Sequence, residues 1–242
     1  MIFYYVRHGD PIYDPDSLTE LGHKQAEALA KRFTKYGLDQ IYASTSERAK
    51  MTAEPTCKAL GLTKTLLDWA NEGRAFNDTC ARNEKGELRW AFQSEKYRKL
   101  FNSPEVRALG FDWHTHPDFK DLNFSNGVKR INAETDAFFK SLGFIHDREK
   151  VCYKAINNDF ADKHRRIALF AHEGFGKLFL SSVLDIPYPY LCTHFELSHS
   201  SVTVIEFDES GNEFYPKVLQ WSNDSHLYKE DILTGYNNSI DI

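Results

Sequence analysis

The chain begins with a short, unbroken apolar segment. Residues 2–6 are all apolar or aromatic, and Arg7 and His8 follow directly. A run of this length that is rich in β-forming residues predicts a strand buried on both faces. Gly9 comes next, so the predicted strand ends by placing two cationic side chains and a glycine at one spot.

The pattern then changes to helical spacing. Residues 17–37 predict an amphipathic helix that Gly37 ends. At its start, Ser17 with Glu20 fits a capping box, and Thr19 is the alternative N-cap. The positions that share the apolar face are Leu21, Gln25, Ala28, Leu29 and Phe33.

Strand and helix patterns alternate over most of the remaining chain. This alternation predicts an α/β fold with a largely parallel sheet and helices on both faces. The last two strands, joined across residues 209–213, predict a hairpin that adds an antiparallel edge. The predicted strands are residues 40–44, 64–70, 165–172, 200–208 and 214–223, and the predicted helices are residues 46–62 and 174–184.

Residues 74–162 do not follow this alternation. The segment is aromatic, charged and helix-prone, with few strand candidates. We expect a helical insertion that caps one end of the sheet. The complete expectation is a single domain over residues 1–242, built as a three-layer α/β/α sandwich with a mostly parallel sheet, an antiparallel edge and a cap at residues 74–162.

Composition restricts the class of protein and of partner. The chain has 242 residues, of which 41% are hydrophobic and 27% charged, and this is typical of a globular domain. A net charge of −5 gives no general attraction to nucleic acid or to an anionic membrane, so any anionic substrate needs locally concentrated positive charge. No apolar stretch approaches the ~20 residues of a membrane span. The four cysteines show no C-x-x-C spacing, so we expect free thiols and a cytoplasmic protein.

Cationic residues follow several of the predicted strands. Arg7 and His8 follow the first strand, Arg48 follows the second, and His172 closes the strand at residues 165–172. In an open α/β sheet, ligands bind beyond the carboxyl ends of the strands. Glu72 follows the third strand and is expected at the same edge.

Two arginines and two histidines in one place require an anion between them. Arginine donates paired hydrogen bonds to phosphate oxygens, and a neutral histidine nitrogen is a competent nucleophile toward phosphorus. The pattern therefore predicts a phosphoryl-transfer site. In this interpretation Gly9 allows the backbone to approach the anion closely.

Several sequence blocks resemble the histidine phosphatase superfamily, which includes the phosphoglycerate mutase-like enzymes. They are "RHG" after the first strand, "LTELGHKQAEALAKRF", "IYASTSERAKMTAEPTCKALGL", "ALFAHEGFGKLF" and the later "SSVTVIEFD". The resemblance covers residues 1–73 and 165–227. Each block lies in the expected order at a predicted strand.

The resemblance implies a role for each of these residues. His8 would form a phosphohistidine, and Arg7, Arg48 and His172 would complete the phosphate pocket. Glu72 would be the proton donor, with Asp10 as the rival for that role. Glu173 follows His172 where many relatives have glycine, so Gly174 is expected to supply the backbone amide.

The sequence leads to one main functional hypothesis and two alternatives. The main one is a metal-independent phosphomonoester hydrolase that acts on a small phosphorylated metabolite and needs no cofactor. A phosphoglycerate mutase-type isomerase would need more cations above the pocket, for which Arg82, Arg89, Lys96 and Arg98 are candidates. A non-catalytic phosphate-binding module is the other alternative. His114 and His116 have the spacing of a metal-ligand pair, but we expect them in a loop of the insertion.

Overall fold

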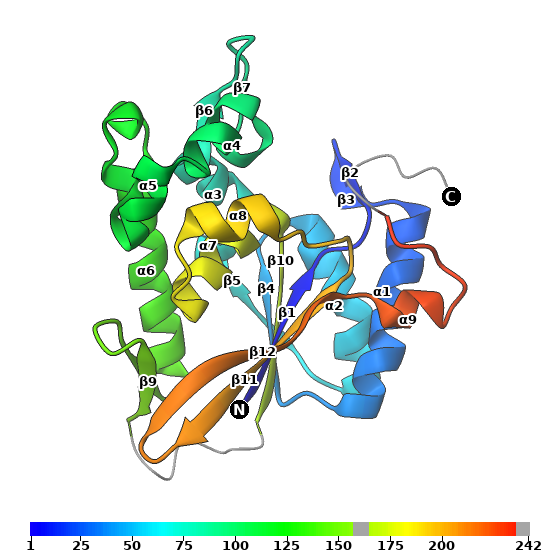
Figure 1. The fold of residues 1–242 in the computed structure, drawn as a ribbon. Helices are drawn as coiled ribbons and strands as arrows, with labels where there is room; N and C mark the ends of the chain where they lie inside the picture. The colour runs from blue at the N-terminus through cyan, green and yellow to red at the C-terminus, as the bar shows by residue number, and fades with distance from the viewer. Residues whose placement is uncertain (157–164, 236–242) are drawn as a thin grey trace.

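The computed structural model describes residues 1–156 and 165–235, and its centre is a sheet of eight strands in the order β5-β4-β10-β1-β11-β12-β9-β8 (Figure 1). Two further pairs, β2–β3 and β6–β7, are separate hairpins. The strands are β1 Ile2–Arg7, β2 Pro11–Tyr13, β3 Asp16–Leu18, β4 Gln40–Ser44, β5 Lys64–Leu67, β6 Cys80–Arg82, β7 Leu88–Trp90, β8 Phe144–Asp147, β9 Cys152–Ala155, β10 Arg166–Ala171, β11 Val202–Ser210 and β12 Glu213–Asn223.

Helices cover both faces of the sheet, so the predicted three-layer α/β/α class is confirmed. None of the helices in the described ranges is both long and apolar enough to cross a membrane. The helices are α1 Glu20–Tyr36, α2 Glu47–Leu60, α3 Glu72–Thr79, α4 Glu95–Phe101, α5 Pro104–Ala108, α6 Phe124–Ser141, α7 Glu173–Leu184, α8 Tyr188–His194 and α9 Ser225–Tyr228.

Strand β1 is buried on both faces, as its continuous apolar run predicted. Phe3 and Tyr5 face the side covered by α6 and α7, where they meet Phe179. Tyr4 and Val6 face the side covered by α1 and α2 and pack in the cluster that contains Phe33. Successive residues of a strand point to opposite faces, so one run of apolar residues supplies both cores.

The limits of the first helix follow its sequence signals. Thr19 is the N-cap of α1, and its side chain accepts a hydrogen bond from the amide of Gly22. Of the two predicted caps, the structure therefore uses Thr19 rather than Ser17. Gly37 ends the helix with φ of 74°, a backbone conformation that favours glycine.

The parallel and antiparallel parts of the sheet are separated at β1. Strand β1 pairs in parallel with β10 and antiparallel with β11, so the amino end of β11 lies beside the carboxyl end of β1. The predicted hairpin of β11 and β12 is confirmed. The sheet then continues through β9 and β8, which the sequence analysis did not predict because polar residues interrupt both short segments, FIHD and CYKA.

The segment at residues 74–162 contains the predicted helices and also the strands β6, β7, β8 and β9. Its aromatic side chains form a continuous core in which Phe101, Trp113 and Phe124 contact one another. Strands β8 and β9 belong to the main sheet, so the expectation of few strands is wrong at residues 144–155. The end of this segment at Asp162 lies outside the described residues. The division into one domain with an insertion stays a prediction.

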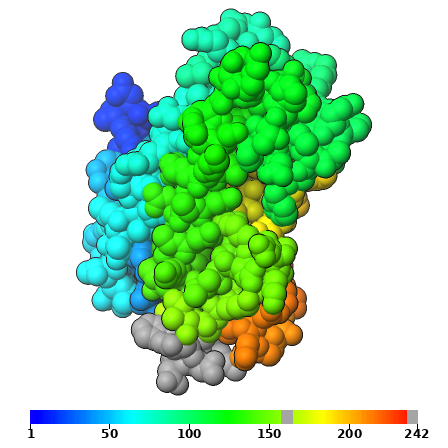
Figure 2. All heavy atoms as spheres, turned by 90° about the vertical axis from the view of Figure 1, so that its left-hand side faces the viewer, coloured from blue at the N-terminus to red at the C-terminus, as the bar shows by residue number. Residues whose placement is uncertain are grey.

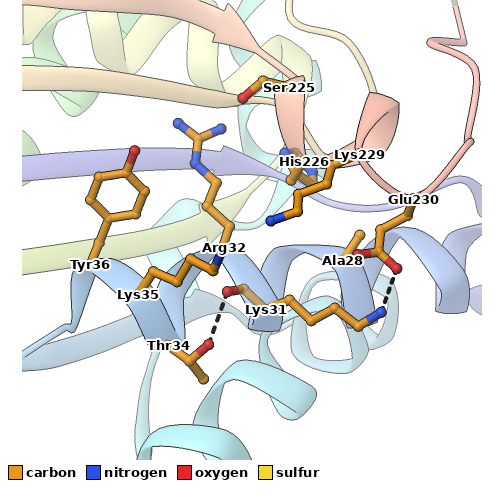
Figure 3. A pocket seen from close by; sticks show the side chains of 10 residues that line it. All are labelled: Ala28, Lys31, Arg32, Thr34, Lys35, Tyr36, Ser225, His226, Lys229 and Glu230. Atoms are coloured by element: carbon orange, nitrogen blue, oxygen red, sulfur yellow. Dashed lines mark hydrogen bonds and ion pairs between the residues drawn. The ribbon is translucent and has the colours of Figure 1, made fainter.

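Helix α9 lies against α1 on the outer side of the sheet (Figures 1 and 3). Arg32 of α1 connects them to β12, because it donates hydrogen bonds to Asn223 Oδ1 at 2.7 Å and to Gln220 Oε1 at 3.0 Å. A pocket lined by α1 and the segment around α9 lies beside this contact.

Candidate active site

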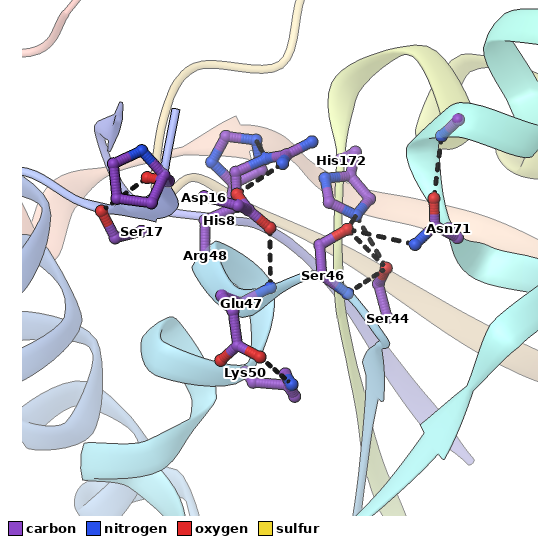
Figure 4. Close-up of polar contacts among 12 residues, drawn as sticks. His8, Asp16, Ser17, Ser44, Ser46, Glu47, Arg48, Lys50, Asn71 and His172 are labelled. Carbon is purple, nitrogen blue, oxygen red and sulfur yellow. Dashed lines mark hydrogen bonds and ion pairs between the residues drawn. The ribbon is translucent and has the colours of Figure 1, made fainter. Parts of the chain in front are cut away.

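The ends of two neighbouring parallel strands bring the two predicted histidines together. Arg7 of β1 pairs with Ala171 of β10, so the residues that follow them, His8 and His172, emerge side by side. Their ring centroids are 5.2 Å apart, and both side chains are buried (Figure 4). The predicted convergence of distant segments is therefore observed.

His8 is held in one tautomer. Its Nδ1–H donates a hydrogen bond to the carbonyl oxygen of Gly9 at 2.7 Å, because a carbonyl can only accept. The other nitrogen, Nε2, accepts a hydrogen bond of 3.2 Å from Arg48 Nε. The lone pair of Nε2 thus faces a guanidinium group, and a group bonded to this nitrogen would lie beside Arg48.

Both histidines are uncharged at neutral pH. Burial, followed by the neighbouring His172 and Arg7, holds the pKa of His8 well below its usual 6.5. Burial and the charges of Arg48 and Arg7 lower the pKa of His172 in the same way. A neutral imidazole keeps the lone pair that a nucleophile requires.

His172 is oriented by the strand next to β10. Its Nε2 forms hydrogen bonds with Ser44 Oγ at 2.8 Å and with Ser46 Oγ at 3.2 Å. Within the described residues its Nδ1 is buried and has no hydrogen-bond partner. A buried nitrogen without a partner is costly to a fold, and it fits a site that receives a polar ligand.

Arg48 is positioned by the first turn of α2 and by an acidic residue that sequence analysis missed. Asp16 lies in the β2–β3 hairpin, and its Oδ1 accepts a hydrogen bond from Arg48 Nη1 at 2.7 Å. Its Oδ2 accepts one from the amide of Glu47 at 2.8 Å. The hairpin therefore fixes the arginine that contacts His8. No motif identified Asp16, because its place depends on how the hairpin folds back.

Arg7 is almost fully buried and is held by several partners. It forms an ion pair of 3.0 Å with Glu173, and it donates to the carbonyl of Leu197. Burial acts to raise the pKa of Glu173, but the charge of Arg7, the interaction with Glu196 and the charge of Lys177 outweigh it and hold that pKa well below its usual value. Glu173 thus lies near the anion site, as its position after His172 indicated, and it neutralises part of the charge on Arg7.

His199 is a third histidine at this site. Its ring centroid is 5.5 Å from that of His8, and its Nε2 accepts a hydrogen bond of 2.8 Å from Arg7 Nη2. Its Nδ1 lies 3.3 Å from Asp10 Oδ1. Burial and the charge of Arg7 lower its pKa to about 4. His199 was not among the candidate site residues that the sequence identified. The antiparallel pairing of β11 with β1 was the signal that could have located it.

Glu72 is anchored at the start of α7. Its Oε1 accepts a hydrogen bond from the amide of Gly174 at 3.1 Å, and its Oε2 accepts one from the amide of Phe175 at 3.0 Å. Burial raises the pKa of Glu72 to about 7, although these two amides oppose the shift. A carboxyl group with a pKa near neutrality can both give and take a proton.

The two predicted glycines make close structural contacts, and their expected roles at the anion stay predictions. A Cβ on Gly9 would lie 2.7 Å from the carbonyl oxygen of Gly22, so glycine is needed there for the close approach of α1. The amide of Gly9 donates to Thr52 Oγ1. The amide of Gly174 donates to Glu72 rather than facing an open site, and a Cβ on Gly174 would collide with the indole of Trp90.

We expect Gly174→Ala to lower the free energy of unfolding by about 1–3 kcal/mol through this collision, although alanine is the better helix former. Urea unfolding measures the loss. In the Trp90→Ala background the same substitution is expected to cost much less, because the indole is gone. An equal cost in both backgrounds would show that Trp90 is not the cause.

A cleft opens beside Arg48 and Glu72, between the β2–β3 hairpin and the inserted segment, and the buried His8 and His172 lie behind its lining. Its volume is about 570 Å³. Figure 2 shows the tip of the hairpin, in dark blue, standing apart from the inserted segment in teal and green. The cleft has one cationic side chain, three acidic ones and an aromatic wall. Its lining residues are Tyr13, Asp16, Thr45, Ser46, Glu47, Arg48, Asn71, Glu72, Gly73, Phe76 and Trp90.

Several other candidates do not line this cleft. Asp10 accepts a hydrogen bond from Thr19 Oγ1 at 2.8 Å and does not line the cleft. His114 bonds to Ser125 Oγ, and His116 lies near Asp118. None of the four insertion cations named above lines the cleft. Residues 1–156 and 165–235 contain no cluster of three or more histidine, cysteine or acidic side chains that could hold a metal ion.

Comparison with protein families agrees with the resemblance seen in the sequence. The model of the histidine phosphatase superfamily (branch 1) matches residues 3–100, which carry His8, Arg48 and Glu72. No curated protein matches the chain. The resemblance to this superfamily is therefore confirmed over the first part of the chain.

Solved structures share the fold over nearly the whole chain. A structure described as mycobacterial hydrolase 1 has a TM-score of 0.58 at 18% identity and covers 92% of this chain and 98% of its own. A phosphoserine phosphatase from Entamoeba histolytica, in complex with phosphoserine, has a TM-score of 0.59 at 16% identity, with coverages of 93% and 98%. A mycobacterial glucosyl-3-phosphoglycerate phosphatase has a TM-score of 0.56 at 18% identity, with coverages of 91% and 98%.

Proposed function

We propose that this protein is a metal-independent phosphomonoester hydrolase that acts on a small phosphorylated metabolite through a phosphohistidine at His8. The observation that carries the proposal is the state of His8. Its proton is fixed on Nδ1 by the Gly9 carbonyl, and its unprotonated Nε2 accepts a hydrogen bond from Arg48. The family match over residues 3–100 supports the same chemistry.

In the first step, His8 Nε2 attacks the phosphorus atom. The Nε2–P bond forms while the bond from phosphorus to the ester oxygen breaks. Arg48 stabilises the charge on the transferring group, because its guanidinium already lies at hydrogen-bond distance from Nε2. Glu72 lines the same cleft and gives its proton to the departing ester oxygen.

In the second step, water hydrolyses the phosphohistidine. Glu72, now ionised, takes a proton from the water as its oxygen attacks phosphorus. The P–Nε2 bond breaks, phosphate leaves and His8 returns to its neutral form. The low pKa of His8 favours the return to a neutral ring.

The charge around the cleft favours hydrolysis over the mutase alternative. A mutase must hold a second phosphate while it retains the first, and this requires cations above the pocket. The cleft instead presents Asp16, Glu47 and Glu72, with Arg48 as the one cationic lining residue among those described. A second phosphate would meet negative charge there.

Release of inorganic phosphate distinguishes the three hypotheses. The protein is incubated with p-nitrophenyl phosphate, and separately with 2- or 3-phosphoglycerate, in the presence of EDTA. A hydrolase frees inorganic phosphate with EDTA present. Interconversion of the phosphoglycerates without phosphate release would support the mutase. Phosphate binding with neither reaction would support the binding module.

Glu72→Gln tests the proton donor. We expect kcat/KM for an alkyl phosphate to fall about 100-fold, because an alkoxide needs a proton in order to leave. For p-nitrophenyl phosphate, whose leaving group is stable as an anion, we expect a loss below about tenfold. Steady-state kinetics of both substrates measures the difference. Equal losses on the two esters would contradict the role, and Asp10→Asn then tests the rival.

The pH dependence should follow the same group. Glu72 has a pKa of about 7, so it is mostly protonated at about pH 6 and mostly ionised at about pH 8. The ratio of kcat/KM for the alkyl ester to that for p-nitrophenyl phosphate should therefore fall as the pH rises through about 7. In Glu72→Gln the ratio should stay flat.

We also propose that the protein works in the cytoplasm. All four cysteines lie in the described part of the chain, and none of them forms a disulfide. Free thiols are typical of a reducing compartment. Alkylation of the protein in fresh lysate under denaturing conditions should label all four.

A further inference from the structure

The molecule has a second concave site, away from the candidate active site. It lies between α1 and the segment at residues 225–230, has a volume of about 430 Å³ and shares no lining residue with the cleft (Figure 3). This volume is in the range of small-molecule pockets. The lining residues are Ala28, Lys31, Arg32, Thr34, Lys35, Tyr36, Ser225, His226, Lys229 and Glu230.

The pocket is strongly positive in a protein with a net charge of −5. Four of its lining side chains are cationic, and Glu230 is the one acidic residue among them. Glu230 is already paired with Lys31. Arg32 uses its guanidinium to hold β12. Two further cations, Lys35 and Lys229, extend from α1 and from the end of α9 (Figure 3).

Lys35 and Lys229 are the two cationic side chains of the pocket that the described contacts leave available to a ligand. Neither forms an ion pair within residues 1–156 and 165–235. The two ammonium groups are close enough that Lys35 lowers the pKa of Lys229. Both side chains are exposed, and an anion bound between the two ammonium groups would reduce their mutual repulsion.

His226 adds a neutral polar group to the same pocket. The residue is 5% exposed, and burial lowers its pKa to about 3, so it is uncharged. Its Nε2 lies 3.0 Å from Ser200 Oγ, whereas its Nδ1 is buried and has no partner among the described residues. When Ser200 donates to Nε2, the proton of the ring is on Nδ1, and this buried N–H is left without a partner among the described residues.

We propose that this pocket is a binding site for a small phosphorylated molecule, separate from the candidate active site. Lys35 and Lys229 hold the phosphate, and His226 and Ser225 add hydrogen bonds. Tyr36, which is half exposed at the rim, offers a ring face to the organic part of the ligand. A nucleic acid is not favoured, because the remaining surface carries net negative charge.

Calorimetric titration with inorganic pyrophosphate tests the proposal on the full chain. In Lys35→Ala/Lys229→Ala we expect the affinity of one site to fall at least about tenfold, because both phosphate-binding charges are lost. The matched control is Lys24→Ala/Lys58→Ala. It removes the same charge from two exposed lysines outside the pocket and should leave this site unchanged.

A third variant separates this site from the candidate active site. Arg48→Ala is expected to remove pyrophosphate binding in the cleft and to keep it in the α1–α9 pocket. The proposal is overturned if the Lys35→Ala/Lys229→Ala variant binds pyrophosphate as tightly as the native chain. It is also overturned if the Lys24→Ala/Lys58→Ala control loses as much affinity as that variant. Binding that Arg48→Ala alone eliminates would also overturn it. Urea unfolding confirms that each variant is folded.

Discussion

Replacing His8 by alanine is expected to reduce the turnover of every phosphomonoester by about 10⁴-fold or more. The imidazole supplies the atom that bonds to phosphorus, and no neighbouring group replaces it. His8 Nε2 is the histidine nitrogen that contacts Arg48, whereas His172 Nε2 bonds to two serine hydroxyls and His199 Nε2 accepts from Arg7. The rate of p-nitrophenyl phosphate hydrolysis measures the loss.

The control for this substitution is His23→Ala, because His23 is exposed on α1 and does not line the cleft. It should keep native activity. Rapid acid and base quenches of a reaction with ³²P-labelled substrate give a second readout, since a phosphohistidine is labile in acid and stable in base. Substantial turnover by His8→Ala, or label on another residue, would eliminate His8 as the nucleophile.

Arg48→Ala is expected to lower kcat/KM by about 10²–10³-fold, equivalent to about 3–4 kcal/mol of transition-state stabilisation. Arg48 donates to the nitrogen that receives phosphorus, so its charge acts where negative charge develops. Arg48→Lys should recover less than tenfold of this loss, because an ammonium cannot reproduce the planar fork. Steady-state kinetics on p-nitrophenyl phosphate separates the three proteins.

Arg89→Ala is the matched control, since Arg89 is an exposed arginine of the insertion that does not line the cleft. It removes the same charge and should leave kcat/KM unchanged. If Arg48→Lys were as active as the native protein, a simple point charge would be sufficient at this position. If Arg89→Ala were as damaging as Arg48→Ala, the cations of the insertion would reach the substrate, and the mutase alternative would regain support.

The two substitutions act on one compact arrangement, in which three neutral rings and two arginines share a buried volume. Burial keeps His8, His172 and His199 uncharged, and the arginines lower their pKa values further. The positive charge that remains is partly balanced by Asp16 on Arg48 and by Glu173 on Arg7. These carboxylates hold the guanidinium groups in place.

The positions of Arg7, His8, His172 and Glu72 could be predicted because these residues follow strands with strong local signals. The apolar run of β1 ends at Arg7 and His8, and β10 ends just before His172. Parallel pairing of neighbouring strands then requires their carboxyl ends to meet. Glu72 was placed at the same edge by the same rule.

The remaining contacts depend on elements with weak local signals. Asp16 reaches Arg48 because the three-residue strands β2 and β3 form a hairpin over α2. Strands β8 and β9 are short and polar residues interrupt them, so their pattern does not separate them from the surrounding loops. The pocket of Lys35, Lys229 and His226 joins α1 to a four-residue helix near the end of the chain.

The sequence by itself determined the alternation of strands and helices, the two apolar faces of β1 and the residues that end each parallel strand. Each of these three features depends on the order of apolar and polar side chains within one short segment, so the local sequence specifies it. Only the tertiary structure decided which groups contact the site residues. His199 lies against His8, Glu173 pairs with Arg7 and Asp16 with Arg48. Glu72 accepts from the amides at the start of α7. Such contacts join residues far apart in the chain, and the packing of whole elements determines their geometry.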